Sequence, residues 1–272
     1  MNNPPRDAEL LKKLIAAGEQ GLNGALLDQL PLPWHIAGES GEGYEISPQL
    51  LKAAQVALLL HQPLLLTGDP GVGKTRFAAA LASRLRLDLQ RIHVKTTTSG
   101  RDLLYSFDDV ARFRDAAILK SDASGETGAK PLASYVRFNG LGRAIMRSAG
   151  PQRLVSPKGF SMREIAGDKH AGRSDIPLGE LFPVEFEGIE GPSHSLVLID
   201  ELDKASRDAP NDLLVEIEEM HFDILELGLT IRADHEHWPI IIITSNSERS
   251  FPDPFLRRCV FHHLELPNEK FR

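Results

Sequence analysis

The chain has 272 residues, of which 42% are hydrophobic and 25% charged, and its formal net charge is -7. This length and composition allow one large globular domain or two small ones. The acidic balance does not favour nonspecific binding of duplex nucleic acid, which needs a basic face. A single cysteine, Cys259, excludes a disulfide within the chain. Because no apolar run reaches the ~20 residues of a membrane helix and the first residues lack a signal-peptide pattern, we expect a cytoplasmic protein.

Residues 1–44 are expected to form a helical extension and a connector. Residues 7–20 place leucine and isoleucine side chains on one helical face, and a stretch rich in proline and glycine follows. Ser47 and Pro48 then have the pattern of an N-cap with proline at the first helical position. We therefore expect the main domain to occupy residues 45–272.

Within this domain, short apolar runs alternate with helical patterns. The runs are nearly continuous, as in strands that are buried on both faces of a parallel sheet. Strands that alternate with helices predict a doubly wound α/β fold. The expected strands are 63–66, 91–94, 196–199 and 240–243, the expected helices are 74–85, 102–113 and 211–220, and the expected loops are 121–130 and an insertion within 156–194.

Residues 68–75, GDPGVGKT, match the pattern G-x-x-x-x-G-K-[ST] of a phosphate-binding loop. They directly follow an expected strand and open an expected helix, which is the setting that this loop requires. The glycines let backbone amides curl around phosphates, and the helix N-terminus adds positive potential. Lys74 can reach the β- and γ-phosphates, and the Thr75 hydroxyl can bind Mg²⁺. The candidate nucleotide-binding residues are Gly68, Asp69, Pro70, Gly71, Val72, Gly73, Lys74, Thr75 and Arg76.

Two further strands end in polar residues that suit nucleotide hydrolysis. Asp200 follows the run at 196–199 and can hold the water shell of Mg²⁺. The next residue, Glu201, can orient and polarise water for attack on the γ-phosphate, which favours hydrolysis over transfer to a small substrate. Asn246 follows the last of the apolar runs and can bond the attacking water or the γ-phosphate. A threonine among 96–98 could hold Glu201 in an inactive pose.

These three motifs, in this order and spacing, resemble an AAA+ ATPase: Walker A at 68–75, Walker B at 196–201 and sensor 1 at Asn246. Within AAA+ the chain looks most like the MoxR group, because a helix runs into an expected β-hairpin at 221–237, inserted before the sensor 1 strand. The resemblance covers about residues 45–266. It implies a P-loop NTPase (ASCE/AAA+) sheet flanked by helices, with ATP as substrate and Mg²⁺ as cofactor.

The resemblance also gives a role to two adjacent arginines, Arg257 and Arg258. AAA+ proteins form rings with nucleotide at each subunit interface, and an arginine after sensor 1 reaches into the neighbour's site. A planar cation suits this role because it stabilises charge on the transferring phosphoryl group. Arg258 is the first choice, since the family usually places this arginine immediately before a residue like Cys259, and Arg257 is the alternative.

The implied function is a ring-forming, chaperone-like remodelling ATPase that acts on a protein partner. The implied partners are further copies in a hexameric ring and a protein client, for instance one with a von Willebrand A-type domain, rather than a membrane or a nucleic acid. In this family a small helical lid follows, and the residues after 266 are too few to form it. Two alternatives stay open: a nucleotide-dependent assembly switch with slow turnover in a bacterial signalling or defence complex, and a nucleic-acid-linked AAA+ motor.

Histidines near the expected hairpin are weaker candidates for a metal site. His235 and His237 share a face if they lie on a strand, but structural zinc normally needs four ligands. A solvated hairpin tip is the simpler interpretation. His262 and His263 would point to opposite faces of a strand and cannot form a metal pair. The apolar residues of the hairpin are expected to serve packing: Phe222, Ile224, Leu225, Leu227, Leu229 and Ile231.

Overall fold

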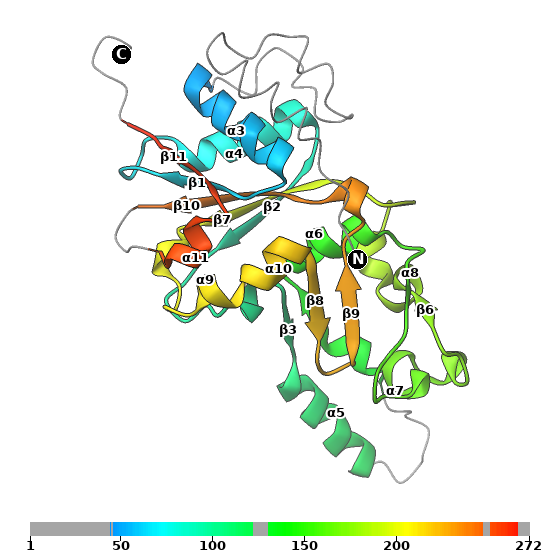
Figure 1. Ribbon diagram of the computed structural model, residues 1–272. Helices are drawn as coiled ribbons and strands as arrows, with labels where there is room; N and C mark the ends of the chain where they lie inside the picture. The colour runs from blue at the N-terminus through cyan, green and yellow to red at the C-terminus, as the bar shows by residue number, and fades with distance from the viewer. Residues whose placement is uncertain (1–43, 45, 122–129, 247–250, 266–272) are drawn as a thin grey trace.

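The computed structural model describes residues 44, 46–121, 130–246 and 251–265 (Figure 1). The predicted helix at 7–20 and nearly all of the predicted loop at 121–130 lie outside these described residues. None of the described helices is long and apolar enough to cross a membrane.

A parallel five-stranded sheet, with the strand order β11-β1-β10-β7-β2, forms the centre of the fold. Its strands are β1 (Leu64–Thr67), β2 (Asp88–His93), β7 (Ser195–Asp200), β10 (Ile240–Ser245) and β11 (Val260–His263). This confirms the predicted parallel sheet of a P-loop fold. Because all strands run the same way, the segments that follow β1, β7 and β10 meet at one edge of the sheet.

Helices cover both faces of this sheet (Figure 1). One layer consists of α3 (Pro48–Leu60) and α4 (Lys74–Leu85), and the other includes α6 (Gly140–Ala149), α9 (Ala209–Asp212) and α10 (Leu214–Glu219). Side chains alternate between the layers along each strand. In β1, Leu64 and Leu66 pack in the core under α3 and α4, whereas Leu65 packs in the core on the α6 side. Burial on both faces explains why the three central strands, β1, β7 and β10, are mostly apolar.

The two helices that flank the phosphate-binding loop form where the sequence predicts them. The Ser47 side chain accepts a hydrogen bond from the Leu50 amide at 3.3 Å, and Pro48 is the first helical residue of α3. The second helix, α4, spans the predicted residues 74–85 and buries Phe77 fully. The N-cap of α3 and the buried faces of both helices therefore fix them around β1.

The helix predicted at 102–113 is wrong in its first half. Residues Tyr105–Phe107 form strand β3, which pairs antiparallel with β4 (Val136–Phe138), and α5 (Asp109–Ser121) begins only after this strand. Tyr105 is almost fully buried. Tertiary pairing and burial override the local helical pattern here. Figure 1 shows β3 and α5 extending away from the central sheet.

The helix predicted at 211–220 consists of two short helices, α9 and α10. Leu213 lies between them with φ −88° and ψ −6°, outside the regular helical values, and its side chain is fully buried. The predicted insertion within 156–194 contains short elements rather than loop alone. Around it the structure has β5 (Leu154–Val155), α7 (Met162–Ala166), β6 (Ile176–Pro177) and α8 (Leu178–Leu181).

The predicted hairpin before β10 is confirmed. It consists of β8 (His221–Ile224) and β9 (Leu229–Arg232), and so ends before the expected residue 237. The apolar side chains that serve packing, as predicted, are Phe222, Ile224, Leu227, Leu229 and Ile231. Leu225 is the exception, because it is 68% exposed at the turn.

Candidate functional site

The predicted phosphate-binding loop connects β1 to α4, and its glycines adopt conformations that other residues rarely can. Gly68, Gly71 and Gly73 have φ angles of 140°, 88° and 98°. A Cβ atom at Gly68 would also lie 2.3 Å from the carbonyl oxygen of Leu264. Gly73 provides no side-chain cap for α4, so the first amides of this helix can donate to an anionic ligand. The loop therefore fits a phosphate chain.

The Lys74 ammonium group is buried among acceptors of this loop. Its Nζ donates to the carbonyl oxygens of Gly68 at 2.6 Å and Asp69 at 3.1 Å, and to Asn246 Oδ1 at 2.9 Å. These bonds satisfy its three donors. Burial lowers the pKa of Lys74, and nearby carboxylates, first that of Asp203, oppose this effect. The positive charge is thus held where phosphate oxygens would bind.

Asp200, at the end of β7, lies beside Thr75 at the start of α4. Asp200 Oδ1 accepts hydrogen bonds from Thr75 Oγ1 at 3.0 Å and from Thr244 Oγ1 at 2.7 Å. The register of β7 and β10, which pairs Ile199 with Ile243, brings Thr244 to this position. Hydroxyl and carboxylate oxygens are ligands that Mg²⁺ prefers. The residues present therefore fit a magnesium ion held by Thr75 and Asp200.

Glu201 occupies a strained turn after β7, with φ 61° and ψ 50°, which costs a residue other than glycine about 1 kcal/mol. Its backbone amide donates to Thr244 Oγ1 at 2.8 Å. Its carboxylate accepts from Asn246 Nδ2 at 3.0 Å on Oε1 and from Lys204 Nζ at 2.6 Å on Oε2. The hydrogen bond from Lys204 is the main factor that lowers the pKa of Glu201. The expectation that a threonine among 96–98 holds this carboxylate is wrong, because Asn246 and Lys204 hold it.

These side chains surround a single cavity of about 260 Å³. Its lining consists of Pro70, Gly71, Gly73, Lys74, Thr75, Arg76, Asp200, Glu201, Thr244 and Asn246. The structure therefore brings together the predicted lysine, threonine, acidic pair and asparagine. Three other predicted residues do not line the cavity but lie next to it in the same loop. Gly68 and Asp69 supply carbonyl oxygens to Lys74, and Val72 packs against the core under α3 and α4.

Sequence reasoning missed three residues of this site, namely Thr244, Asp203 and Lys204. Asp203 is 4% exposed and accepts from the Asn246 amide at 3.3 Å, which fixes the end of β10. Asp203 and Lys204 stand in the short polar segment directly after Glu201, so their position next to the acidic pair was an available signal. Thr244 precedes Asn246 by two residues, but its contact with the acidic pair depends on strand register.

The two candidate arginines follow α11 (Asp253–Leu256) and do not line the cavity. Arg258 Nε donates to Glu218 Oε2 on α10 at 2.8 Å, and its Nη1 donates to the carbonyl oxygen of Pro254 at 3.0 Å. Arg257 is exposed, and within the described part of the chain its side chain forms no ion pair or hydrogen bond.

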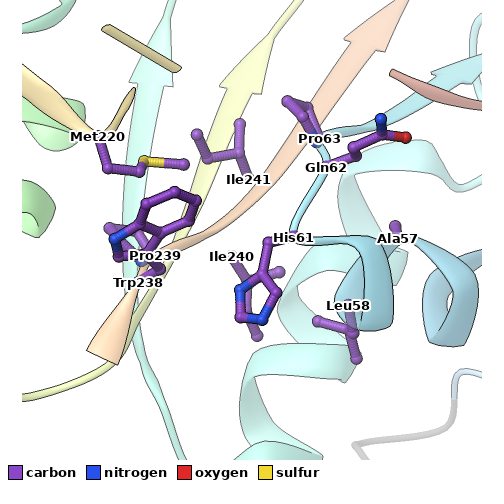
Figure 2. A pocket seen from close by; sticks show the side chains of 10 residues that line it. All are labelled: Ala57, Leu58, His61, Gln62, Pro63, Met220, Trp238, Pro239, Ile240 and Ile241. Carbon is purple, nitrogen blue, oxygen red and sulfur yellow. The ribbon is translucent and has the colours of Figure 1, made fainter. Parts of the chain in front are cut away.

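A second hollow lies at the opposite ends of the strands, and Figure 2 shows its lining. The rings of Trp238 and His61 lie edge to face across it at 5.7 Å between centroids. Its volume of about 20 Å³ has room for roughly one water molecule, so it cannot hold a nucleotide. A larger groove of about 590 Å³ lies between β4 and α8, but it has no phosphate-binding loop.

The histidines near this hollow are not on the hairpin. His235 and His237 lie in a 3₁₀ turn after β9, so they do not share a strand face. The His235 ring instead packs on Trp238 at 5.0 Å, and His237 Nδ1 lies 2.6 Å from Asp234 Oδ2. In the described ranges, no group of three or more His, Cys, Asp or Glu residues could hold a metal ion. His262 and His263 are adjacent residues of β11, so their side chains point to opposite faces of the sheet.

Comparison with known proteins finds one family model that matches the region of the phosphate-binding loop. The model of a family described as AAA domain (dynein-related subfamily) matches residues 63–144. No curated protein matches the chain. Among solved structures, a candidate ATPase from Cytophaga hutchinsonii is 13% identical, with a TM-score of 0.42, over 96% of this chain and 52% of that one.

Two structures of RuvB from Thermotoga maritima, a point mutant and the Holliday junction branch migration motor, are also similar. They are 15% and 16% identical, with TM-scores of 0.37 and 0.34, over 80% of this chain and 44% and 43% of theirs. The chain therefore spans about half the length of these structures. The phosphate-binding loop lies within residues 63–144, so this part of the chain is similar to an AAA domain.

Proposed function

We propose that this protein is an ATP-hydrolysing AAA+ ATPase of the MoxR-like group, which assembles into a ring and remodels a protein partner. One observation carries the proposal: the start of α4 and the ends of β7 and β10 meet around one cavity of about 260 Å³ and bring together Lys74, Thr75, Asp200, Glu201 and Asn246. This combination places a phosphate-binding cation, a pair of magnesium ligands and a base with its orienting amide in one place.

The loop and Lys74 would bind the phosphate chain of ATP. Lys74 would leave the carbonyl oxygens of Gly68 and Asp69 and donate to oxygens of the β- and γ-phosphates. Thr75 Oγ1 and Asp200 Oδ1 lie 3.0 Å apart. The threonine hydroxyl would bind Mg²⁺ directly, and Asp200 would bind it through water. The ion would supply positive charge that offsets the negative charge of the phosphate oxygens.

Glu201 is the candidate general base. Its carboxylate would accept a proton from water while the water oxygen attacks the γ-phosphorus, and the bond to the leaving ADP breaks. Asn246 already donates to this carboxylate at 3.0 Å, so it can orient either the base or the water. The lowered pKa of Glu201 keeps the carboxylate ionised at neutral pH and so able to accept the proton.

A ring of identical copies would bring Arg257 or Arg258 of a neighbouring copy to the cavity, which neither arginine lines within one described chain. Arg258 is favoured by the resemblance, but it would first have to leave Glu218, 2.8 Å away. Arg257 is exposed and would need to break no such pair. Both arginines therefore remain candidates, and the geometry supports Arg257 more than the sequence did.

Apolar surface far from the cavity supports a protein as the client. On α5, which projects from the body of the domain (Figure 1), Val110 is 80%, Phe113 70% and Ile118 52% exposed. Leu225 at the hairpin turn is 68% exposed. Exposed apolar side chains of this size fit a protein partner, for instance one with a von Willebrand A-type domain, better than a phosphate backbone. The net charge of -7 also does not favour a nucleic-acid motor.

A nucleotide-dependent assembly switch is the second candidate function. It is favoured by the hydrogen bonds to Glu201, because Lys204 and Asn246 each donate to one of its two carboxylate oxygens. A base held in this way would turn over slowly until assembly or a partner released it. Such a protein would bind ATP and assemble without rapid hydrolysis.

The ATPase rate per subunit, measured against protein concentration, tests these functions. The proteins compared are wild type, Glu201→Gln and Glu236→Gln. The last is the matched control, because Glu236 is exposed and does not line the cavity. A rate that rises with concentration and is lost only in Glu201→Gln supports a ring-forming hydrolase. ATP-dependent assembly with little hydrolysis supports the switch, and a rate that DNA strongly stimulates supports the motor. Absence of ATP binding would overturn all three.

A further inference from the structure

We propose that Lys204 is a positioning residue that holds the Glu201 carboxylate in place for hydrolysis. The inference rests on the proposed function and concerns a residue outside the three motifs. It comes from the short 3₁₀ turn Leu202–Lys204, which follows Glu201 directly.

The turn brings Lys204 back to the residue that begins it. The Lys204 amide donates to the Glu201 carbonyl oxygen at 3.0 Å, and Lys204 Nζ donates to Glu201 Oε2 at 2.6 Å. Asn246 Nδ2 donates to the other carboxylate oxygen at 3.0 Å. Two donors from two elements, one on each oxygen, therefore define the orientation of the carboxylate.

This pair differs from an ordinary surface ion pair, which contributes little. The two side chains are 40% and 39% exposed, but Glu201 lines the cavity and belongs to a chain of contacts. Lys74 Nζ donates to Asn246 Oδ1, and Asn246 Nδ2 donates to Glu201. Lys204 thus stands at the end of a network that begins at the phosphate-binding loop.

The contacts in this network indicate the role of Lys204 during hydrolysis. When Lys74 turns to phosphate oxygens, Asn246 loses the donor that fixes its amide group. Asn246 can then turn towards the attacking water, as the proposed mechanism requires. The bond from Lys204 is the contact on Glu201 that this rearrangement leaves intact, because it shares no atom with Lys74 or Asn246.

The charges around Glu201 also matter for its basicity. Lys204 and Lys74 lower the pKa of Glu201. Asp203 lies in the same turn and Asp200 directly precedes Glu201, and Asp200 faces His93 of β2 with 3.9 Å between Oδ2 and Nδ1. The ammonium groups of Lys204 and Lys74 therefore stabilise the ionised carboxylate of Glu201.

The first test needs no nucleotide. Protein labelled with ¹³C at the glutamate side-chain carboxyl is examined by NMR at neutral pH, and the Glu201 signal is assigned from its loss in Glu201→Gln. We expect loss of the Lys204 hydrogen bond in Lys204→Met to shift the Glu201 signal, Lys204→Arg to shift it little, and Lys52→Met, which changes an exposed lysine of α3, to leave it unchanged. An unchanged Glu201 signal in Lys204→Met overturns the proposal.

The second test measures hydrolysis against ATP concentration with the same variants. We expect Lys204→Met to lower kcat about tenfold, as for loss of one charged hydrogen bond, with KM unchanged. Lys204→Arg should restore most of the rate. A kcat that stays constant or rises in Lys204→Met overturns a positioning role. If wild type binds ATP without hydrolysing it, the proposed hydrolysis fails, while the NMR signal of the Glu201 carboxyl still decides whether Lys204 holds Glu201.

Discussion

Lys74 Nζ donates to Asn246 Oδ1 at 2.9 Å, so the first residue of α4 and the residue after β10 are joined inside the cavity. Phosphate oxygens must compete with this contact for the ammonium group. Asn246 therefore satisfies Lys74 in this structure, and in the proposed mechanism it would orient the reacting groups once phosphate has bound.

Asn246→Ala should separate these two effects. Removal of the amide leaves Lys74 with one acceptor fewer, so we expect ATP to bind as tightly as in wild type or slightly more tightly. We expect kcat to fall about tenfold to a hundredfold, because the base loses an orienting donor. Equilibrium binding and steady-state rates measure the two effects, with Asn211→Ala, at an exposed position of α9, as the control. Weakened binding with an unchanged kcat would contradict the assignment.

Thr75→Ala should raise the Mg²⁺ requirement. The hydroxyl of Thr75 lies 3.0 Å from Asp200 Oδ1, and we expect both to serve the same ion. The concentration of Mg²⁺ that gives half-maximal ATP binding should rise about tenfold or more, since a ligand oxygen is lost. Thr75→Ser keeps the hydroxyl and should behave as wild type. An equal effect in both variants would indicate a packing defect and not the loss of a ligand.

Thr244→Val should destabilise the domain although it keeps the shape of the side chain. Thr244 is fully buried, donates to Asp200 and accepts from the Glu201 amide at 2.8 Å. Valine leaves that amide without an acceptor, which costs about 1–3 kcal/mol in the free energy of unfolding. Urea unfolding monitored by circular dichroism measures this loss. Thr97→Val, at an exposed position, should change stability by less than about 0.5 kcal/mol.

Arg257→Ala and Arg258→Ala should distinguish the two candidate arginines. The variant that removes the arginine used in trans should keep ATP binding and lose hydrolysis by about a thousandfold. Loss of the other arginine should have a small effect, with Arg258→Ala also costing the contact to Glu218. The rate against protein concentration is the measurement, and Arg163→Ala, an exposed arginine of α7, is the control. Unchanged rates in both variants would show that neither arginine acts in the nucleotide site of a neighbouring copy.

Cys259 should be nearly inert in the folded protein. Burial raises the pKa of this thiol to about 12, so very little thiolate exists at pH 8. We expect slow alkylation by iodoacetamide under native conditions and rapid alkylation in urea, where the pKa returns towards its ordinary value. Mass spectrometry over time measures the modified fraction. Rapid native alkylation would show that the thiol is more open than its burial indicates.

The parts of the site that the sequence predicted are those encoded by adjacent residues. The eight residues at 68–75 specify their own loop, because the glycines set its conformation and the lysine and threonine follow at fixed offsets. Asp200, Glu201 and Asn246 could be placed because each ends an apolar run, and the ends of parallel strands meet at one edge of the sheet.

The parts that escaped prediction depend on distant pairing. Thr244 reaches Asp200 through the register of β10 on β7, and a local pattern carries no information about register. Strand β3 has three residues, too few to show a period, and pairs with a strand about 30 residues further along the chain. The position of Lys204 close to Glu201 was a signal in the sequence, but a charged residue in a polar segment is usually solvated, so this position alone did not predict the hydrogen bond to the carboxylate.

The position of β1 has a consequence for the synthesis of the protein. This strand carries the phosphate-binding loop, yet both of its neighbours, β10 and β11, begin more than 170 residues later in the chain. During synthesis the apolar segment Leu64–Leu66 therefore lacks both neighbouring strands until most of the domain has been made. Closing such long loops slows folding and exposes the segment to aggregation. We expect the nascent chain to need a chaperone until β11 has emerged, and nucleotide to bind only after that point.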